Sequence, residues 1–264
     1  MIFDVQFSPA RCSWPEYRDA VLAAEDAGFS TVWTLDHLSG AAFSGHTMLE
    51  CFTLLGALGV ATSRIGLGSL VANAANRHPG LLAAAATTAQ ELSEGRLILG
   101  LGAGASPTSY FASEQHVVRA PIAPTMAARH ALLEQTLDLL DAQWAPDRAE
   151  TWNGFPQPDP VPPVLLGVNS PALAAIAGAR TSGINLRWNH PDRAALLAAA
   201  RAAHRGGDDP TWISSVWVEW DDAIFDPSHP LHAALVAEGV NRIILAVFTS
   251  PDLAAIKRAG AALR

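Results

Sequence analysis

The chain has 264 residues and a formal net charge of −8, with half of its residues hydrophobic and 16% charged. No stretch is a basic block, so we expect no nucleic-acid binding, which needs clustered Lys and Arg to neutralise phosphates. No apolar run reaches the roughly 20 residues of a membrane span, and no basic segment followed by a long apolar core stands at the start. With Cys12 and Cys51 far apart in sequence, these features predict a cytoplasmic protein with reduced thiols and no membrane association.

Short apolar runs alternate with longer segments typical of helices along the whole chain. The predicted strands are Ile2–Phe7, Ser30–Leu35, Ile65–Val71, Leu97–Leu101, Val164–Gly167, Ile184–Arg187, Trp212–Val218 and Asn241–Phe248. The predicted helices are Trp14–Gly28, an Ala-rich segment that starts at Pro79, Thr125–Trp144, Pro171–Gly183, Pro191–Arg205, Pro230–Gly239 and Pro251–Leu263. A strand, a crossover helix and a further strand in this order build a parallel sheet.

The number of these alternations favours one architecture. Eight strands alternating with helices in 264 residues predict an α/β fold, a single (β/α)8 TIM barrel that forms one domain over residues 1–264. The alternative is a doubly wound open sheet. It usually needs fewer strands, and GLGAG at 100–104 comes too late in the chain for the usual dinucleotide fingerprint.

Active sites of such barrels lie at the C-terminal ends of the strands. Among the residues predicted there, His37 is the strongest catalytic candidate, because an imidazole exchanges protons near neutral pH. The alternative is that His37 caps its own loop or pairs with Asp36. The predicted rim has neither a His-x-His group with carboxylates nor a Gly-x-Ser-x-Gly elbow, so we expect no metal site and no serine nucleophile. A metal-dependent barrel hydrolase would have to assemble its site from scattered His and Asp residues.

Gly100, Gly102 and Gly104 stand at the end of the predicted fourth strand. Glycines at such a position let the backbone approach a flat or anionic ligand closely. The alternative is that they only allow a tight turn over the barrel mouth. The single lysine, Lys257, falls in the last predicted helix, so Schiff-base chemistry is not expected.

Three segments, in their order and spacing, resemble the bacterial luciferase-like superfamily of flavin- and deazaflavin-dependent oxidoreductases. They are AEDAGFSTVWTLDHL at 24–38, IGLGSLVANAANRHP at 65–79 and LSEGRLILGLGAG at 92–104. In that superfamily the cofactor ring sits in the barrel mouth, and an irregular bulge at the end of the third strand supports its back. The resemblance therefore implies an oxidoreductase with the same fold.

The resemblance also implies roles for residues at several strand ends. A non-proline cis peptide is frequent in the bulge, and by position it is expected at Ser69-Leu70. His37 is expected to face the substrate, and Asp36 the polar edge of the ring. Asn169 and Ser170 would hold the cofactor's phosphate, since helix N-termini bind anions through free N–H groups. The implied cofactor-binding set is Asp36, Ser69, Leu70, Gly102, Ala103, Gly104, Asn169 and Ser170.

Two branches of the superfamily differ in their cofactor. This sequence resembles the branch that uses coenzyme F420 for hydride transfer more than the branch that uses FMN, in its Asp-His pair, its Gly-Ser-Leu bulge and its glycine run. The first alternative is a monooxygenase that uses FMN, with a reductase as partner. The second is a flavin-binding relative without catalysis. A small organic molecule is the expected substrate, and a homodimer formed through the barrel helices is usual for the family.

The sequence departs from the family pattern near the site. Ala105 stands where the sugar-phosphate dehydrogenase branch has a carboxylate, which argues against a sugar-phosphate substrate with the same proton donor. The loops after the fourth and seventh strands are short, which predicts a more open pocket or a larger substrate. Trp188 and Trp220 lie in the predicted rim and are expected to form the substrate wall. The implied mechanism is hydride transfer at the cofactor ring, with His37 supplying or removing the proton.

Overall fold

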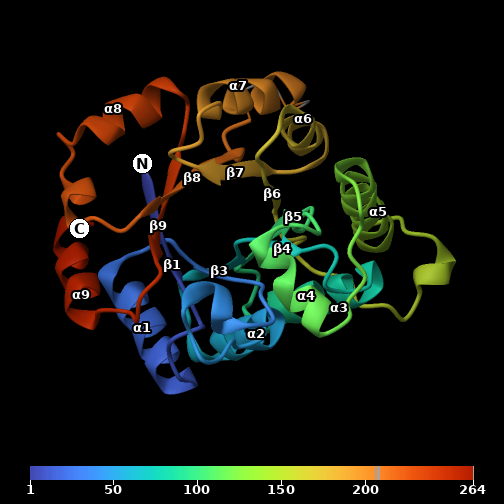
Figure 1. The fold of residues 1–264 in the computed structure, drawn as a ribbon, viewed down its shortest axis with the longest axis horizontal. Coiled ribbons are helices and arrows are strands. Elements are labelled where there is room, and N and C mark those ends of the chain that lie inside the picture. The colour runs from blue at the N-terminus through green and yellow to red at the C-terminus, as the bar shows by residue number, and fades with distance from the viewer. Residues whose placement is uncertain (205, 207–208, 264) are drawn as a thin grey trace.

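The computed structural model describes residues 1–204, 206 and 209–263 of the chain. In this described part, parallel strands form one sheet in the order β3-β2-β1-β9-β8-β7-β6-β5-β4. An additional pairing of β3 with β5 closes the sheet into a barrel (Figure 1). The strands are β1 Ile2–Phe7, β2 Thr31–Thr34, β3 Gly66–Ser69, β4 Ala72–Asn73, β5 Leu97–Gly102, β6 Val164–Gly167, β7 Gly183–Arg187, β8 Ile213–Glu219 and β9 Arg242–Val247.

β3 and β4 together occupy the place of one barrel strand. β3 pairs with β2 along its whole length, and β4 continues beside β5 through Ala72 and Asn73. Between them, Leu70 and Val71 leave the regular strand. With the interrupted strand counted once, the barrel has eight parallel strands, so the predicted (β/α)8 architecture is confirmed.

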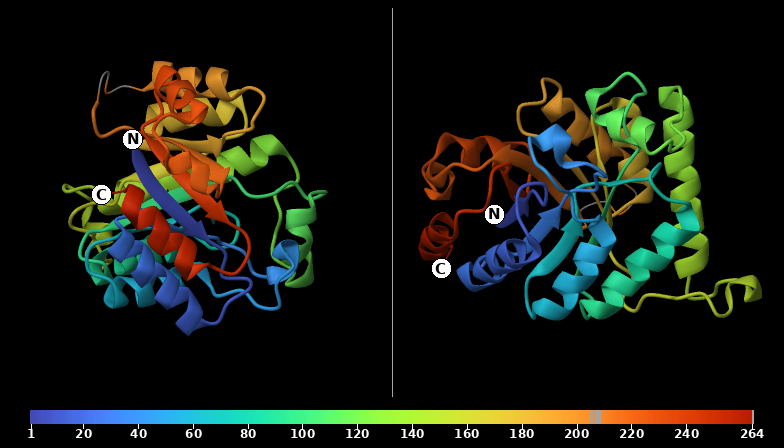
Figure 2. Two further views of the ribbon diagram at one scale, coloured as in Figure 1. Left: turned by 90° about the vertical axis from the view of Figure 1, so that its left-hand side faces the viewer. Right: turned by 60° about the horizontal axis from the view of Figure 1, so that its bottom comes forward.

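Helices surround this barrel (Figures 1 and 2). The longer ones are α1 Trp14–Ala27, α2 Cys51–Ala61, α3 Pro79–Leu92, α5 Met126–Trp144, α6 Pro171–Arg180, α7 Arg193–Ala203, α8 Pro230–Ala237 and α9 Leu253–Ala262. The short elements are α4 Ser113–Val117 and the 3-10 turns η1 Gly40–Phe43, η2 Tyr110–Ala112, η3 Glu150–Trp152 and η4 Asp222–Phe225. The last helix, α9, lies beside α1 and so completes the ring (Figures 1 and 2).

Local sequence signals set several helix ends. Ser13 begins α1 with a capping box, in which its amide donates 2.8 Å to the Glu16 carboxylate. Gly28 ends the same helix in the left-handed conformation at φ 96°, which glycine adopts without a Cβ clash. Ser170 begins α6, and its hydroxyl accepts a hydrogen bond from the amide of Leu173. Ser13 and Ser170 thus end loops at the barrel mouth, whereas Gly28 begins a loop at the opposite end of the barrel.

The barrel interior is filled at its base by Trp33, which is fully buried. The indole Nε1 donates 2.8 Å to Asp4, and Arg242 donates to both oxygens of the same carboxylate at 2.7 and 2.9 Å. A side chain at Gly68 on the adjacent strand β3 would overlap the indole ring. The base is therefore a packed plug, which leaves the opposite end of the barrel for a site.

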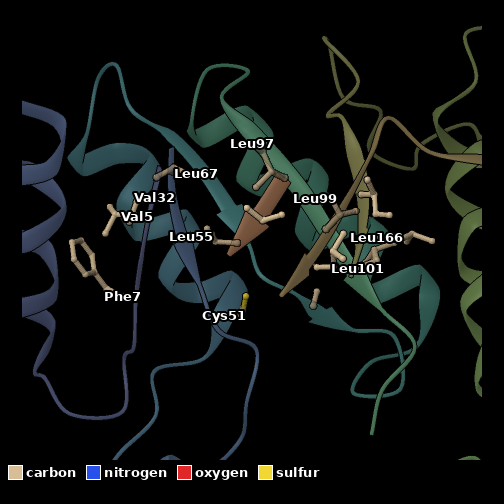
Figure 3. Packing of buried hydrophobic residues seen from close by; sticks show 14 of the residues in the cluster. Val5, Phe7, Val32, Cys51, Leu55, Leu67, Leu97, Leu99, Leu101 and Leu166 are labelled. Atoms are coloured by element: carbon tan, nitrogen blue, oxygen red, sulfur yellow. The ribbon is translucent and has the colours of Figure 1, made fainter. Parts of the chain in front are cut away.

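The main hydrophobic core lies between the strands and the helices. Figure 3 shows Val5, Val32 and Leu67 on neighbouring strands, with Leu55 of α2 packed near them. Leu97, Leu99, Leu101 and Leu166 continue this layer along β5 and β6. The alternation along β5 places the leucines against the helices and the intervening residues toward the barrel axis.

The structure differs from the predicted elements in several places. The predicted helix Pro171–Gly183 ends at Arg180, and Gly183 begins β7. Helix α2 was not predicted, because CFTLLGALGVA is apolar at nearly every position and contains two glycines, so it lacks a 3.6-residue period. Helix α7 begins at Arg193, two residues later than expected, and the predicted end at Arg205 lies outside the described residues. The stretch after β5 contains η2 and α4.

No described helix has the length and apolar character needed to cross a membrane.

Candidate active site

A cavity of about 890 Å³ opens at the C-terminal ends of the barrel strands. Residues at or just after the ends of the barrel strands line it, and η1, η2, α4 and the start of α5 add its outer wall. Its volume falls within the range of roughly 300–1,000 Å³ that cofactor and ligand sites occupy. The site therefore lies at the end of the barrel where the sequence predicted it.

One wall of the cavity is the interruption of the third strand, where Leu70 and Val71 are joined by a cis peptide bond. The sequence placed this bond one residue earlier, at Ser69-Leu70, and that expectation is wrong. Ser69 still pairs with Thr34 in the regular ladder, and its hydroxyl donates 2.8 Å to the carbonyl of Gly100. Ser69 is fully buried and outside the cavity lining, whereas Leu70 lines it.

The glycines at the end of β5 make room for the displaced Val71. A Cβ at Gly102 would lie 2.7 Å from Cγ2 of Val71, and a Cβ at Gly167 on β6 would lie 3.1 Å from the same atom. A Cβ at Gly100 would overlap the carbonyl oxygen of Ser69. The glycine run thus accommodates the bulge, and it also supplies cavity wall through Gly102, Ala103 and Gly104.

Asp36 lines the cavity, but the protein itself occupies most of its hydrogen-bonding capacity. Arg77 donates to both carboxylate oxygens at 2.7 and 2.8 Å, and the amide of Asn73 donates 2.8 Å. Arg77 also pairs with Glu50 and lies over the ring of Phe52 at 4.9 Å. These contacts tie the end of β2 to the segment that follows the bulge.

His37 lies beside Asp36 in the cavity lining, and a carboxylate that is distant in sequence holds it. Its Nδ1 is 3.0 Å from Oε1 of Glu114 in α4. The other oxygen, Oε2, accepts hydrogen bonds from the amides of Leu38 at 2.9 Å and Ser39 at 3.0 Å. Glu114 thereby fastens α4 to the loop that carries the histidine.

These contacts also set the charge of Glu114. Burial alone tends to raise the pKa of the carboxyl group, because it disfavours the charged form. The hydrogen bond and charge of His37 and the two backbone amides act in the opposite direction and outweigh burial. The pKa of Glu114 is therefore held below its ordinary value, and the group is ionised near neutral pH.

Two aromatic rings flank the imidazole of His37. Phe43 of η1 meets it edge to face with ring centroids 4.8 Å apart, and Phe111 of η2 lies at 5.8 Å. Both phenylalanines line the cavity. The hydroxyl of Tyr110 donates 3.4 Å to the carbonyl of Ala41, which links η2 to η1 above this cluster. The imidazole of His37 therefore has two aromatic neighbours in addition to the glutamate.

A third aromatic residue lines a different part of the cavity. Trp217 of β8 has the guanidinium of Arg187 over its ring at 4.8 Å and packs edge to face on Phe248 at 5.8 Å. Neither predicted wall residue lines the cavity. Trp188 is covered by Arg193, which lies 3.6 Å over its ring, and Trp220 packs on Phe29 and Phe225 outside the barrel.

The predicted phosphate-binding pair is divided. Asn169 lines the cavity just after β6, and the adjoining Ser170 caps α6 without lining the cavity. Two arginines, Arg129 at the start of α5 and Arg187, also line the cavity. Within the described residues, neither has a carboxylate within ion-pairing distance, while Asp36 is taken by Arg77. The cavity therefore offers positive charge that the protein does not neutralise.

Sequence reasoning missed Glu114, Arg77 and Trp217. Arg77 stands within the quoted segment at 65–79, so its place after the bulge was a usable signal. Glu114 follows the glycine run in a stretch without periodicity and meets His37 across 77 positions, which no local pattern reveals. Trp217 was within a predicted strand, but the inward-facing register of that strand was not assigned. Within residues 1–204, 206 and 209–263, no three His, Cys, Asp or Glu side chains form a metal-binding group.

Comparison with known proteins relates this geometry to a family. The family model described as luciferase-like monooxygenase matches residues 4–247. The chain is 31% identical over 193 residues to the F420-dependent glucose-6-phosphate dehydrogenase of Nakamurella multipartita, covering 67% of this chain and 52% of that protein. It is 30% identical over 203 residues to the F420-dependent hydroxymycolic acid dehydrogenase of Mycobacterium tuberculosis, covering 72% and 54%. The chain thus spans about half the length of these relatives.

Solved structures share the fold at low sequence identity. An F420-dependent secondary alcohol dehydrogenase in complex with an F420-acetone adduct superposes with a TM-score of 0.77 at 17% identity, covering 100% of this chain and 99% of that one. The coenzyme F420-dependent tetrahydromethanopterin reductase of Methanopyrus kandleri gives 0.72 at 14% identity, with coverage of 98% and 97%. These structures show the shared fold, and the family model that extends over residues 4–247 shows that the chain belongs to the luciferase-like monooxygenase family.

Proposed function

We propose that this protein is a coenzyme F420-dependent oxidoreductase that transfers hydride to or from a small organic substrate, with His37 as the proton-handling group. The observation that carries the proposal is that the bulge at Leu70 and Val71 and the imidazole of His37 line one cavity. The curated relatives with F420-dependent names support the choice of cofactor. The interpretation of residues 1–264 as one domain is part of the same proposal.

The composition of the cavity fits a planar, anionic cofactor. Leu70 and Val71 offer an apolar surface for a ring, and Gln6 and Asn185 supply polar side chains at the barrel axis. The positive charge of Arg129 and Arg187, together with Asn169, suits the phosphate and carboxylates of the cofactor's tail. When bound, coenzyme F420 would supply the two-electron hydride chemistry.

Asp36 has a supporting role in this proposal. Because Arg77 and the amide of Asn73 occupy its oxygens, the carboxylate holds the cavity wall in place. Ser69, Gly102, Ala103 and Gly104 would shape the surroundings of the cofactor. Ser170 would contribute indirectly, because it caps the helix that begins beside the cavity. Ser69 acts from behind the cavity wall through its bond to Gly100.

His37 would move one proton for each hydride transferred. Its Nδ1 is engaged with Glu114, so Nε2 is the nitrogen available to the cavity. Phe43 and Phe111 pack against the imidazole and so hold the ring for proton exchange with a bound substrate. Ala105 follows the glycine run in the cavity lining and provides no carboxylate for this step.

The second candidate is an FMN-dependent monooxygenase with a reductase as partner, and the word monooxygenase in the family's description is the observation on its side. Titration of the purified protein with coenzyme F420 and with FMN separates the two, since the bound cofactors absorb differently. We expect coenzyme F420 to bind and FMN to compete weakly. Tight binding of FMN together with oxygen-dependent turnover would reject the F420 assignment, and binding of either cofactor without turnover on any substrate would indicate a non-catalytic relative.

We also propose a homodimer in the cytoplasm. The outer faces of α2 and α3 expose Val60 and Leu81, which are 71% and 67% accessible, and such apolar side chains suit a helix-mediated contact. Both cysteines are free and buried, in accord with a reducing compartment. Sedimentation velocity at micromolar concentration tests the dimer, and a single species of 27.8 kDa would reject it.

A further inference from the structure

We propose that Glu114 is a positioning residue that fixes the tautomer of His37, so that the neutral imidazole presents an unprotonated Nε2 to the cavity. The catalytic consequence of this inference rests on the proposed function. The tautomer itself does not, and it can be measured without cofactor or substrate. Glu114 needs no contact with the reacting atoms for this role.

The two oxygens of Glu114 have separate partners. Oε2 accepts from the amides of Leu38 and Ser39, at 2.9 and 3.0 Å, and these contacts hold the loop after β2. Oε1 is directed at Nδ1 of His37 at 3.0 Å. A purely structural anchor would need only the first set of contacts. The contact of Oε1 with the imidazole is additional, and it uses a carboxylate oxygen of a side chain that is only 5% exposed.

The chemistry of the carboxylate determines the position of the proton. An ionised carboxylate has no hydrogen to donate, so a hydrogen bond to Nδ1 requires that Nδ1 carries the proton. In the neutral imidazole the other nitrogen, Nε2, is then an acceptor. The low pKa of Glu114 keeps the carboxylate ionised, so this preference holds throughout the neutral range.

The neighbouring rings prevent the imidazole from escaping this arrangement. Phe43 and Phe111 pack against it from η1 and η2, and Arg11 donates to the carbonyls of Phe43 and Ser44 at 3.0 and 3.2 Å. A flip of the imidazole about its Cβ–Cγ bond would put Cδ2 in the place of Nδ1, so it would lose the hydrogen bond to the carboxylate and require the same rings to repack. The orientation is therefore held by packing, and the tautomer by the hydrogen bond.

For an alcohol substrate the step balances in full. The hydroxyl O–H bond would break and its proton would pass to Nε2 of His37, while the carbinol C–H bond would break and its hydride would be taken up by the oxidised coenzyme, which supplies the two-electron chemistry when bound. The electron pair of the O–H bond forms the carbonyl π bond. In the reverse direction the protonated imidazole returns the proton to the carbonyl oxygen as hydride is delivered to the carbon. An imidazole with Nε2–H and a bare Nδ1 cannot accept the first proton on the cavity side.

Glu114→Gln is a sharp test, because the new side chain has one acceptor oxygen in place of two. If that oxygen stays with the amides of Leu38 and Ser39, the amide NH₂ of the glutamine faces His37 and donates to Nδ1. The imidazole must then carry its proton on Nε2. The substitution is nearly isosteric, so it reverses the tautomer with little change in volume.

The experiment records long-range ¹H–¹⁵N correlation spectra of the imidazole rings in the wild-type protein and the variant, with His37 assigned by the signal missing in His37→Gln. In the neutral form, we expect protonated Nδ1 in the wild type and protonated Nε2 in Glu114→Gln. A wild-type His37 protonated on Nε2 would overturn the proposal, even if the variant did not fold. A variant that keeps the wild-type tautomer would overturn it as well.

Kinetics separate positioning from a structural role. We expect Glu114→Gln to lower kcat by about 10²-fold or more, the range of general acid–base catalysis, with the dissociation constant of coenzyme F420 changed less than about threefold. Glu134→Gln, an exposed carboxylate on α5, is the matched control and should leave kcat unchanged. Equal losses in kcat and cofactor affinity would indicate a disordered site and reject positioning. If both proteins show the expected tautomers but the wild type does not bind coenzyme F420, the proposed function is rejected and the role of Glu114 is not.

Discussion

Arg77 donates two hydrogen bonds, of 2.7 and 2.8 Å, to the two oxygens of Asp36, and this pair stands between the barrel strand β2 and the bulge. The Asp36 side chain is 1% exposed and that of Arg77 14%, so the buried carboxylate would be poorly hydrated without the arginine. The pair therefore links the stability of the fold to the shape of the cavity wall.

Removal of this arginine should destabilise the protein strongly. Arg77→Met leaves the Asp36 carboxylate buried without its counter-ion, and we expect the free energy of unfolding to fall by about 3 kcal/mol. Urea denaturation followed by circular dichroism measures the change. Arg18→Met removes an exposed arginine that pairs with Asp19 and should have little effect. A loss for Arg77→Met no larger than that of the control would show that the buried pair does not support the wall.

The contact between Gly102 and Val71 predicts a rescue. Gly102→Ala introduces a Cβ 2.7 Å from Cγ2 of Val71, so the bulge must move and cofactor affinity should fall at least tenfold. Val71→Ala removes that methyl group, and the double variant should recover most of the lost affinity. Fluorescence titration with coenzyme F420 gives the three dissociation constants. Additive losses in the double variant would contradict this account of the glycine run.

Loss of the imidazole should affect turnover and leave binding nearly intact. His37→Ala removes the proton acceptor, and we expect kcat to fall by about 10²-fold or more. Because other residues form the surface against which the cofactor packs, the dissociation constant of the cofactor should stay within about threefold of wild type. Steady-state assays at saturating cofactor measure the first quantity, and equilibrium titration the second. Full turnover in the variant would remove His37 from the mechanism.

The hydrogen bonds that the Glu114 carboxylate accepts predict a pH dependence of stability. The folded-state pKa of Glu114 lies below its ordinary value of 4.5, so these contacts contribute stability that is fully present above that pH. This contribution is lost as the pH falls through the lower, folded-state pKa. The difference in Tm between wild type and Glu114→Gln should therefore be largest near neutral pH and shrink toward acid. A difference that grew as the pH fell would contradict the sign.

The barrel could be predicted from the sequence because its strands are covered on both faces and stand out as apolar runs. Helix α2 could not, since Cys51–Ala61 is apolar all round and has no periodicity to detect. The cis bond was placed one residue early because its position was inferred from the family resemblance, and only the β2 pairing shows that Ser69 remains in the strand. Pairing of this kind depends on tertiary contacts.

The site was predictable where its residues are contiguous in the chain. Asp36 and His37 follow a strand directly, and the end of a barrel strand faces the cavity. The contact between Glu114 and His37 was not predictable, because it depends on how two loops far apart in the sequence pack together, which no local pattern indicates. Trp188 and Trp220 were selected as rim aromatics, but the inward-facing position on β8 belongs to Trp217, and register decides which side of a strand a residue lines.

The most direct test is a crystal structure of the complex with coenzyme F420. We predict that the ring lies against Leu70 and Val71, with its reactive carbon on the side that faces Nε2 of His37 and its tail near Asn169 and Arg187. A cofactor bound instead in the separate cavity of about 410 Å³ between Trp144 and Arg180, or a ring turned so that His37 cannot reach the substrate side, would contradict the account.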